Sequence, residues 1–139
     1  MAWLLDTNVW VQLLKRRAPE IRRRIDALDA ASVLTCAVVK AELWHGALKY
    51  EDPAKRLYQV NEAISPYLSL PFDDTAAHHY AALRHRLEQR GEIIGPNDLK
   101  IAAICLAHDL TLVTNNTAEF SRIPALLLED WNGPAPARP

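Results

Sequence analysis

Short apolar segments alternate with segments of helical periodicity along most of this 139-residue chain. The first apolar segment, residues 2–5, contains no turn residue and is followed by the carboxylate of Asp6. Apolar residues then recur at helical spacing across residues 9–14. We therefore expect a buried strand, a turn at residues 7 and 8, and a helix. A carboxylate at the end of such a strand lies where open α/β sheets bind their ligands.

The same order of strand and helix recurs down the chain. Further strands are expected at residues 32–36, 67–70, 111–114 and 125–128. Further helices are expected at residues 19–28, 37–49, 53–64, from Asp73 or Asp74 to Gly91, from Asn97 or Asp98 to His108, and at 118–121. Strands that alternate with helices favour a parallel sheet that is covered on both faces.

We predict an α/β fold, a three-layer α/β/α sandwich around a central, mainly parallel five-stranded sheet. A chain of this length suits one domain, which we place at residues 1–131. The tail at residues 132–139 is rich in proline and is predicted to be disordered. No apolar run approaches the roughly 20 residues that span a bilayer, so we expect no membrane segment.

The overall charge gives no sign of a nucleic-acid partner, because the formal net charge is only −1. Two local clusters of basic residues, at 15–17 and 22–24, could still contact phosphate groups. Solvated helix faces explain the same clusters equally well. Cys36 and Cys105 lie far apart in apolar surroundings, which suits buried free thiols in a reducing compartment. A cytoplasmic location is therefore expected.

Three carboxylates and one amide occupy places that the apolar pattern does not require. Asp6 follows the first expected strand, Glu42 lies in the helix after the second, and Asp98 opens the helix before the fourth. Asn116 lies in the polar turn after the fourth strand. Right-handed βαβ crossovers bring the carboxyl ends of parallel strands to one edge of the sheet. We therefore expect these four side chains to gather at that edge.

Such a group of side chains indicates a metal site. Clustered carboxylates raise one another's pKa unless a cation lies among them. Oxygen ligands without histidine or cysteine select Mg²⁺ or Mn²⁺ over zinc. An ion of this kind lowers the pKa of a bound water and stabilises charge on a phosphate oxygen. The pattern therefore predicts hydrolysis of a phosphodiester, with protein ligands that position the metal.

Each of these residues also has a simpler explanation when it is taken alone. Asp6 and Asp98 could each cap the amino end of a helix. Glu42 could be a surface glutamate, and Asn116 could be an ordinary turn residue. The metal-site hypothesis is stronger than these separate explanations taken together. They would require four unrelated polar residues to fall by chance on the same edge of the predicted sheet.

Four segments together resemble a known family, and they are residues 5–8, 41–46, 95–103 and 112–120. In this order and spacing they are similar to a PIN domain, and more narrowly to the VapC ribonuclease toxins of prokaryotic type II toxin–antitoxin modules. The resemblance runs from Met1 to about Trp131. It implies a three-layer α/β/α fold, an acidic site for Mg²⁺ with Mn²⁺ as a substitute, and endoribonuclease activity on RNA. It also implies a homodimer that a cognate antitoxin protein neutralises.

The resemblance assigns roles to particular residues. Asp6, Glu42 and Asp98 match the family's acidic triad, which supplies both catalytic groups and metal ligands. Asn116 matches a fourth position that is Asp in many relatives, and it would be the weaker ligand because an amide carries no charge. One firmly bound Mg²⁺ is therefore expected. Thr7 would lie close enough to orient a water or a phosphate.

Two other functions stay open at this point. A phosphatase with Asp6 as a covalent nucleophile would usually carry a second acid two residues later, where this chain has Asn8. A PIN-like module could instead bind RNA or a partner without turnover, although a decayed site would be expected to lose at least one acid. The leading prediction is a Mg²⁺-dependent endoribonuclease toxin that hydrolyses RNA with a metal-activated water.

Overall fold

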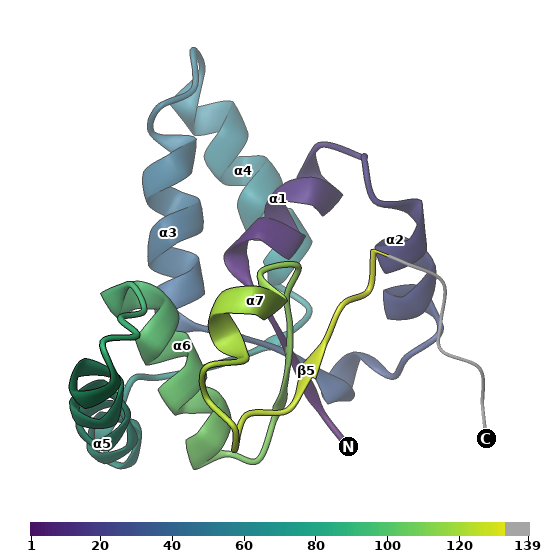
Figure 1. The fold of residues 1–139 in the computed structure, drawn as a ribbon. Helices are drawn as coiled ribbons and strands as arrows, with labels where there is room; N and C mark the ends of the chain where they lie inside the picture. The colour runs from purple at the N-terminus through teal and green to yellow at the C-terminus, as the bar shows by residue number, and fades with distance from the viewer. Residues whose placement is uncertain (133–139) are drawn as a thin grey trace.

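A computed structural model describes residues 1–132, which form one five-stranded sheet with helices around it (Figure 1). The strands are β1 (Trp3–Leu5), β2 (Val33–Cys36), β3 (Leu68–Leu70), β4 (Thr111–Val113) and β5 (Leu128–Glu129). Their order in the sheet is β3-β2-β1-β4-β5, and each neighbouring pair is parallel. This arrangement confirms the predicted α/β fold with five parallel strands.

Helices cover the sheet on both faces. They are α1 (Thr7–Leu14), α2 (Pro19–Asp26), α3 (Ala37–Ala47), α4 (Pro53–Ile64), α5 (Asp74–Arg90), α6 (Pro96–Ala107) and α7 (Thr117–Phe120), with a short 3₁₀ helix at Ala30–Ser32. Figure 1 shows α5 and α6 on one side of the sheet and α2 on the other, which gives the three predicted layers. None of the helices within residues 1–132 is both long and apolar enough to cross a membrane.

The central strand β1 fixes the position of the first carboxylate. Leu4 pairs with Leu34 of β2 on one side and with Leu112 of β4 on the other. Leu4 and Leu5 have no exposed surface, and burial of a leucine side chain contributes about 1.5–3 kcal/mol. Asp6 follows directly, so the best-packed strand of the sheet carries it.

Several helix ends follow from local sequence as predicted. The carboxylates of Asp52 and Asp73 cap α4 and α5, accepting hydrogen bonds from the backbone N–H groups of Lys55 and Ala76 at 3.1 and 3.0 Å. Gly91 ends α5 with a φ of 67°, in the left-handed region where glycine has no steric penalty. Asp73 and Gly91 thus set both ends of α5, and Asp52 sets the start of α4.

Two predicted boundaries near the site are wrong. Residues 7 and 8 are the first residues of α1 rather than a separate turn, because Asp6 already caps that helix. Helix α6 begins at Pro96, two residues before Asp98, and Gly95 holds the cap position. The explanation of Asp98 as a helix cap is therefore wrong, and its carboxylate projects from the first helical turn.

The last strand is also displaced from its predicted place. Residues 121–126 form turns, in which the N–H of Leu126 donates to the carbonyl of Ile123. β5 then covers Leu128–Glu129, where Glu129 pairs with Val113 of β4. Only Leu126 of the predicted strand 125–128 is buried, and 63% of Leu127 is exposed, so the apolar run indicated neither uniform burial nor the strand register. The predicted tail at 132–139 lies outside the described residues beyond Asn132, and its disorder stays a prediction.

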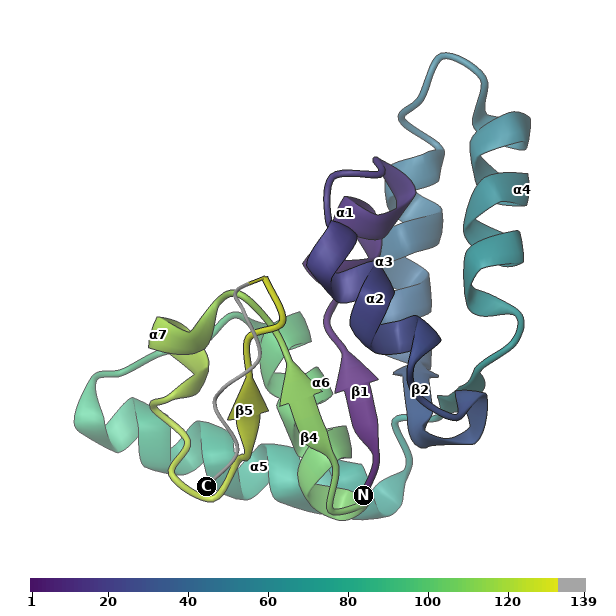
Figure 2. The same cartoon turned by 90° about the vertical axis from the view of Figure 1, so that its right-hand side faces the viewer.

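The carboxyl ends of the strands all point the same way. Figure 2 shows the arrowheads directed toward α1 and the hairpin of α3 and α4, which extends beyond the sheet. The amino ends of α1, α3, α6 and α7 lie at this edge because each helix follows a strand or a loop that ends there. The fold therefore collects at one place the segments that carry the predicted site residues.

Candidate active site

Asp6 is held rigidly at the end of β1. Its backbone N–H donates to the carbonyl of Val113 at 2.9 Å. One carboxylate oxygen accepts from the N–H of Thr7 at 2.7 Å, and the other accepts from the hydroxyl of Thr114 at 2.8 Å. Burial raises the pKa of Asp6, the two hydrogen bonds lower it, and the charge of Glu42 raises it again. Asp6 is thus both a helix cap and a member of an acidic cluster.

Glu42 faces this edge from the second turn of α3. Its Oε1 accepts a hydrogen bond of 2.6 Å from the hydroxyl of Thr7, the first residue of α1. The surface explanation of Glu42 is therefore incomplete, because the side chain is partly buried and joined to another helix. Thr7 lies at the first position of α1, and its hydroxyl fixes the Glu42 carboxylate.

Asp98 completes the predicted triad. Glu42 and Asp98 line one open pocket, together with residues 95–97. Burial raises the pKa of Asp98 to about 6, helped by the negative charges of Asp6, Glu42 and Glu119. These three charges act on one carboxyl group although they come from three other segments of the chain, so the acids form a cluster.

At the fourth position, Asn116 makes a contact that the sequence did not predict. Asn116 lies partly buried at the start of α7, but its side-chain amide donates to Glu119 Oε2 at 2.9 Å. The other oxygen of Glu119 accepts from the N–H of Gly95 at 3.4 Å. Asn116 therefore holds Glu119 in place, and Glu119 brings the charge that the amide lacks.

Two polar residues of this site were missed by reasoning from sequence. Glu119 lies one helical turn after Asn116, a spacing that could have indicated a pair across the first turn of α7. Thr114 follows β4 just as Asp6 follows β1, and its buried hydroxyl also accepts from the N–H of Asn116 at 3.0 Å. A polar residue directly after a buried strand was the signal for Thr114.

The chemistry of these side chains fits a hard divalent cation. Carboxylate oxygens with no soft ligand favour Mg²⁺ or Mn²⁺. The pKa of Asp98 is raised first by burial and then by the charges of Asp6, Glu42 and Glu119, and a cation would offset that repulsion. Within residues 1–132, however, no three acidic, histidine or cysteine side chains yet converge on one point. The bond from Thr7 to Glu42 accounts for part of this, because it directs one Glu42 oxygen toward α1.

The same geometry disfavours a covalent phosphatase. Only 4% of Asp6 is exposed, and both of its oxygens accept hydrogen bonds. A nucleophile needs an exposed oxygen with a free lone pair directed at the substrate. Asn8, at the place where such enzymes usually carry their second acid, is exposed on α1. Asp6 is therefore better suited to hold a cation than to attack phosphorus.

A parallel sheet with clustered carboxylates at the ends of its strands defines the class of this protein. The family model of the PIN domain matches residues 3–126. The chain belongs to the PIN-domain family.

Within the PIN-domain family, the chain is most informatively compared with relatives named VapC. The chain is 34% identical to Ribonuclease VapC2 of Haemophilus influenzae over 131 residues, which cover 94% of this chain and 98% of the relative. It is 33% identical to the tRNA(fMet)-specific endonuclease VapC of Shigella flexneri over 132 residues, covering 95% and 99%. The crystal structure of VapBC2 from Rickettsia felis, bound to a promoter DNA fragment, matches with a TM-score of 0.88 and 34% identity, covering 94% of this chain and 99% of that one.

Proposed function

We propose that this PIN-domain protein is a metal-dependent endoribonuclease and the toxin of a type II toxin–antitoxin module. The observation that carries the proposal is the approach of Asp6, Glu42 and Asp98 from three distant segments. Thr7, next to Asp6, donates to Glu42, and Glu42 lines one pocket with Asp98. A cluster that costs stability without a cation is typical of a site that binds one. The names of the VapC relatives, as ribonucleases, support RNA as the substrate.

The proposed catalytic groups are Asp6, Glu42 and Asp98, with Asn116 and Glu119 behind them. The three acids would hold one divalent ion, Mg²⁺ or in its place Mn²⁺, which supplies an activated water and neutralises charge on the scissile phosphate. Thr114 keeps the carboxylate of Asp6 fixed, and Thr7 does the same for Glu42. Thr7 is also placed to contact a phosphate or a water once Glu42 turns toward the ion.

The proposed partners are an RNA substrate and a cognate antitoxin. VapBC proteins form toxin–antitoxin systems, and a small reading frame adjacent to this gene is the place to seek the antitoxin. A homodimer is part of the same proposal. A cytoplasmic location agrees with the buried free thiols of Cys36 and Cys105.

The experiment compares total RNA after expression of the unaltered protein and of Asp98→Asn. We expect discrete cleavage sites, tRNA being the first class to inspect, and growth arrest only with the unaltered protein. Purified protein should lose cleavage in EDTA and regain it with Mg²⁺ or Mn²⁺. Cleavage by purified Asp98→Asn would refute the assignment of the site. RNA binding without cleavage across a metal series would favour the non-catalytic binding module.

A further inference from the structure

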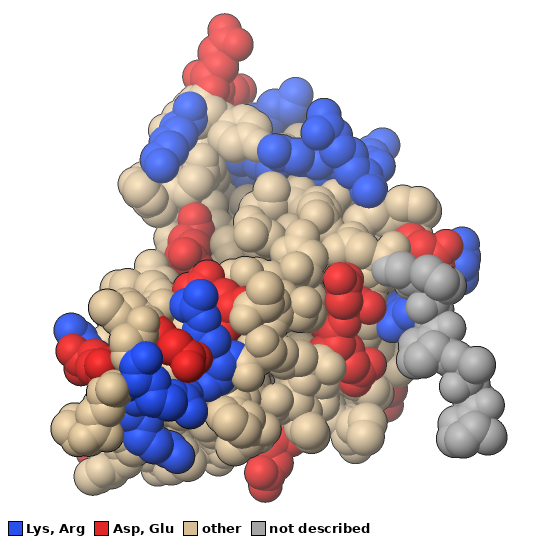
Figure 3. Space-filling view, in the orientation of Figure 1, with Lys and Arg blue, Asp and Glu red and all other residues tan. Residues whose placement is uncertain are grey.

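Three arginines lie together beside the acidic cluster, at the end of α5 and just after α7. Arg86, Arg90 and Arg122 line a pocket whose floor is apolar, formed in part by Leu83, Leu87 and Ile123. All three arginines are exposed, whereas the three apolar residues are buried. Figure 3 shows basic side chains next to acidic ones over the region of α5, α6 and α7.

The three guanidinium groups have no carboxylate partner in the part of the chain that the structure describes. Each instead donates to a backbone carbonyl: Arg86 to Ala82 at 3.4 Å, Arg90 to Arg122 at 2.8 Å, and Arg122 to Ile93 at 2.8 Å. These bonds orient the side chains but leave their charges uncompensated. Most of their N–H donors stay available, because a guanidinium carries five.

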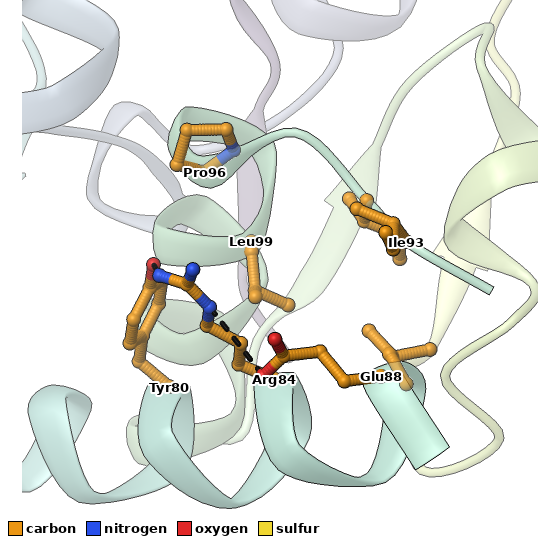
Figure 4. Close-up of a pocket in the computed structure, with 8 residues that line it drawn as sticks. Tyr80, Arg84, Glu88, Ile93, Pro96 and Leu99 are labelled. Atoms are coloured by element: carbon orange, nitrogen blue, oxygen red, sulfur yellow. Dashed lines mark hydrogen bonds and ion pairs between the residues drawn. The ribbon is translucent and has the colours of Figure 1, made fainter. Parts of the chain in front are cut away.

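Three other arginines do have an acidic partner. Arg84, two residues before Arg86 on α5, donates to the hydroxyl of Tyr80 at 3.1 Å and pairs with Glu88 at 3.6 Å (Figure 4). In the basic cluster that the sequence indicated, Arg22 pairs with Asp26 at 3.7 Å and Arg23 with Glu20 at 2.8 Å. Ion pairs within a helix weaken the attraction of these arginines for an external anion.

The pocket is connected to the acidic cluster through one short loop. Arg122 binds the carbonyl of Ile93, and Asp98 lies five residues further along the chain. Five residues span at most about 18 Å even when fully extended. The backbone of Asp98 therefore lies within about 18 Å of the carbonyl that Arg122 binds. Glu119, the acid nearest to Arg122 in sequence, is already bonded to Asn116 and Gly95.

We propose that Arg86, Arg90 and Arg122 form a docking surface for the phosphate backbone of the RNA substrate beside the acidic cluster. The proposal rests on the ribonuclease function proposed above. Arginine forms strong, often bidentate bonds with phosphate, and an apolar floor between guanidiniums suits an unstacked base or a ribose. The protein needs such a surface because its net charge of −1 provides no general attraction for RNA.

The test measures binding of a fluorescein-labelled, mixed-sequence single-stranded RNA by fluorescence anisotropy, in EDTA and over a range of salt concentrations. Replacement of each arginine by glutamine should weaken binding about threefold to tenfold and reduce the slope of log K against log salt by about 0.7. Arg86→Gln is the cleanest variant, since Arg86 bonds only within its own helix. Arg86→Lys keeps the charge and should keep most of the affinity.

The matched control is Arg23→Gln, which removes one positive charge from α2, where Arg23 is paired with Glu20. It should leave affinity and salt slope unchanged. An equal loss in the control would mean that only net charge matters, and would overturn the proposal. RNA binding by the Arg86→Gln/Arg122→Gln double variant that equals that of the unaltered protein would also overturn the proposal. This holds even if the double variant no longer binds the antitoxin. If Arg90→Gln melts at a lower temperature but keeps full affinity for RNA, Arg90 stabilises the carboxyl end of α5 and does not bind RNA.

Cleavage assays separate failure of this proposal from failure of the proposed function. With Mg²⁺ present, the arginine variants should show a raised KM and nearly unchanged kcat on short RNA substrates. If the unaltered protein binds RNA through these arginines but cleaves none, the docking surface stands and the ribonuclease function fails. If it cleaves RNA and the variants match its KM, the docking surface fails and the function stands.

Discussion

The hydroxyl of Thr114 lies 2.8 Å from Oδ2 of Asp6, although 108 residues separate the two in sequence. The bond joins the ends of β1 and β4 at the floor of the candidate active site. Because Thr114 also accepts from the N–H of Asn116, one buried hydroxyl connects the first and the fourth predicted site residues. The contribution of the Thr114 hydroxyl to the free energy of unfolding can be compared with that of a second buried threonine in the same sheet.

Thr35→Val and Thr114→Val should change stability in opposite directions. The Thr35 hydroxyl is buried in β2 and has no hydrogen-bond partner among the residues described. Its replacement by a methyl group of similar size should raise the free energy of unfolding by about 1 kcal/mol. Thr114→Val removes the donor to Asp6 and should lower it by about 1–3 kcal/mol. Urea denaturation measures both, and equal effects of the same sign would contradict the hydrogen-bond assignment.

Removal of a single carboxylate should abolish cleavage without loss of the fold. Asp98→Asn and Asp6→Asn keep the size of the side chain but remove the charge proposed to hold the ion. We expect a fall in kcat of at least about 100-fold, together with loss of growth inhibition. Circular dichroism provides the control for folding. Full activity in either variant would place the site elsewhere.

The acidic cluster should make stability depend on pH in the absence of metal. The pKa of Asp98 is about 6 in the folded protein and about 3.9 in an unfolded chain. The folded state therefore binds more protons between these values, and stability falls as pH rises toward 6 and stays low above it. Asp98→Asn should melt higher than the unaltered protein in EDTA, by about 3 °C at pH 7.5.

The pH comparison has a clear contrary outcome. The difference in melting temperature between Asp98→Asn and the unaltered protein should shrink as pH is lowered from 7.5 to 5, because Asp98 then becomes protonated. Saturating Mg²⁺ should also remove this difference in melting temperature, because it stabilises the unaltered protein. A variant that melts lower than the unaltered protein in EDTA at every pH would show that Asp98 is a structural residue.

A charge at the fourth position should strengthen metal binding and weaken the metal-free fold. Asn116→Asp exchanges the amide that donates to Glu119 for a carboxylate that repels it. We expect a lower melting temperature in EDTA and a larger increase on addition of Mn²⁺ than the unaltered protein shows. Glu119→Gln should have the opposite effect on both measurements. Isothermal titration with Mn²⁺ checks the affinity directly, and an unchanged affinity in both variants would exclude position 116 and Glu119 from the ion's surroundings.

The sequence by itself determined the order of strands and helices, because hydrophobic periodicity and helix caps are local. The caps at Asp52 and Asp73 and the stop at Gly91 needed only neighbouring residues. The strand β5 could not be located in this way. Its register depends on pairing with β4, so the strand predicted at residues 125–128 overlaps β5 only at Leu128.

The three acids Asp6, Glu42 and Asp98 were also within reach of sequence reasoning. A carboxylate after a buried strand or at the start of a buried helix is placed by topology, since parallel strands end at one edge. What topology cannot give is the direction of each side chain. Only the tertiary structure decided that Asn116 faces Glu119, that Thr7 holds Glu42, and that Thr114 holds Asp6.

The physical reason is that periodicity and capping act over a few residues, whereas charge and hydrogen bonding act through space. The raised pKa of Asp98 depends on Asp6, Glu42 and Glu119, none of which is a neighbour in sequence. The three unpaired arginines beside the cluster likewise come from two separate segments of the chain. Sequence determined which groups this protein carries to the edge of its sheet. Tertiary structure decided which of them act on one another.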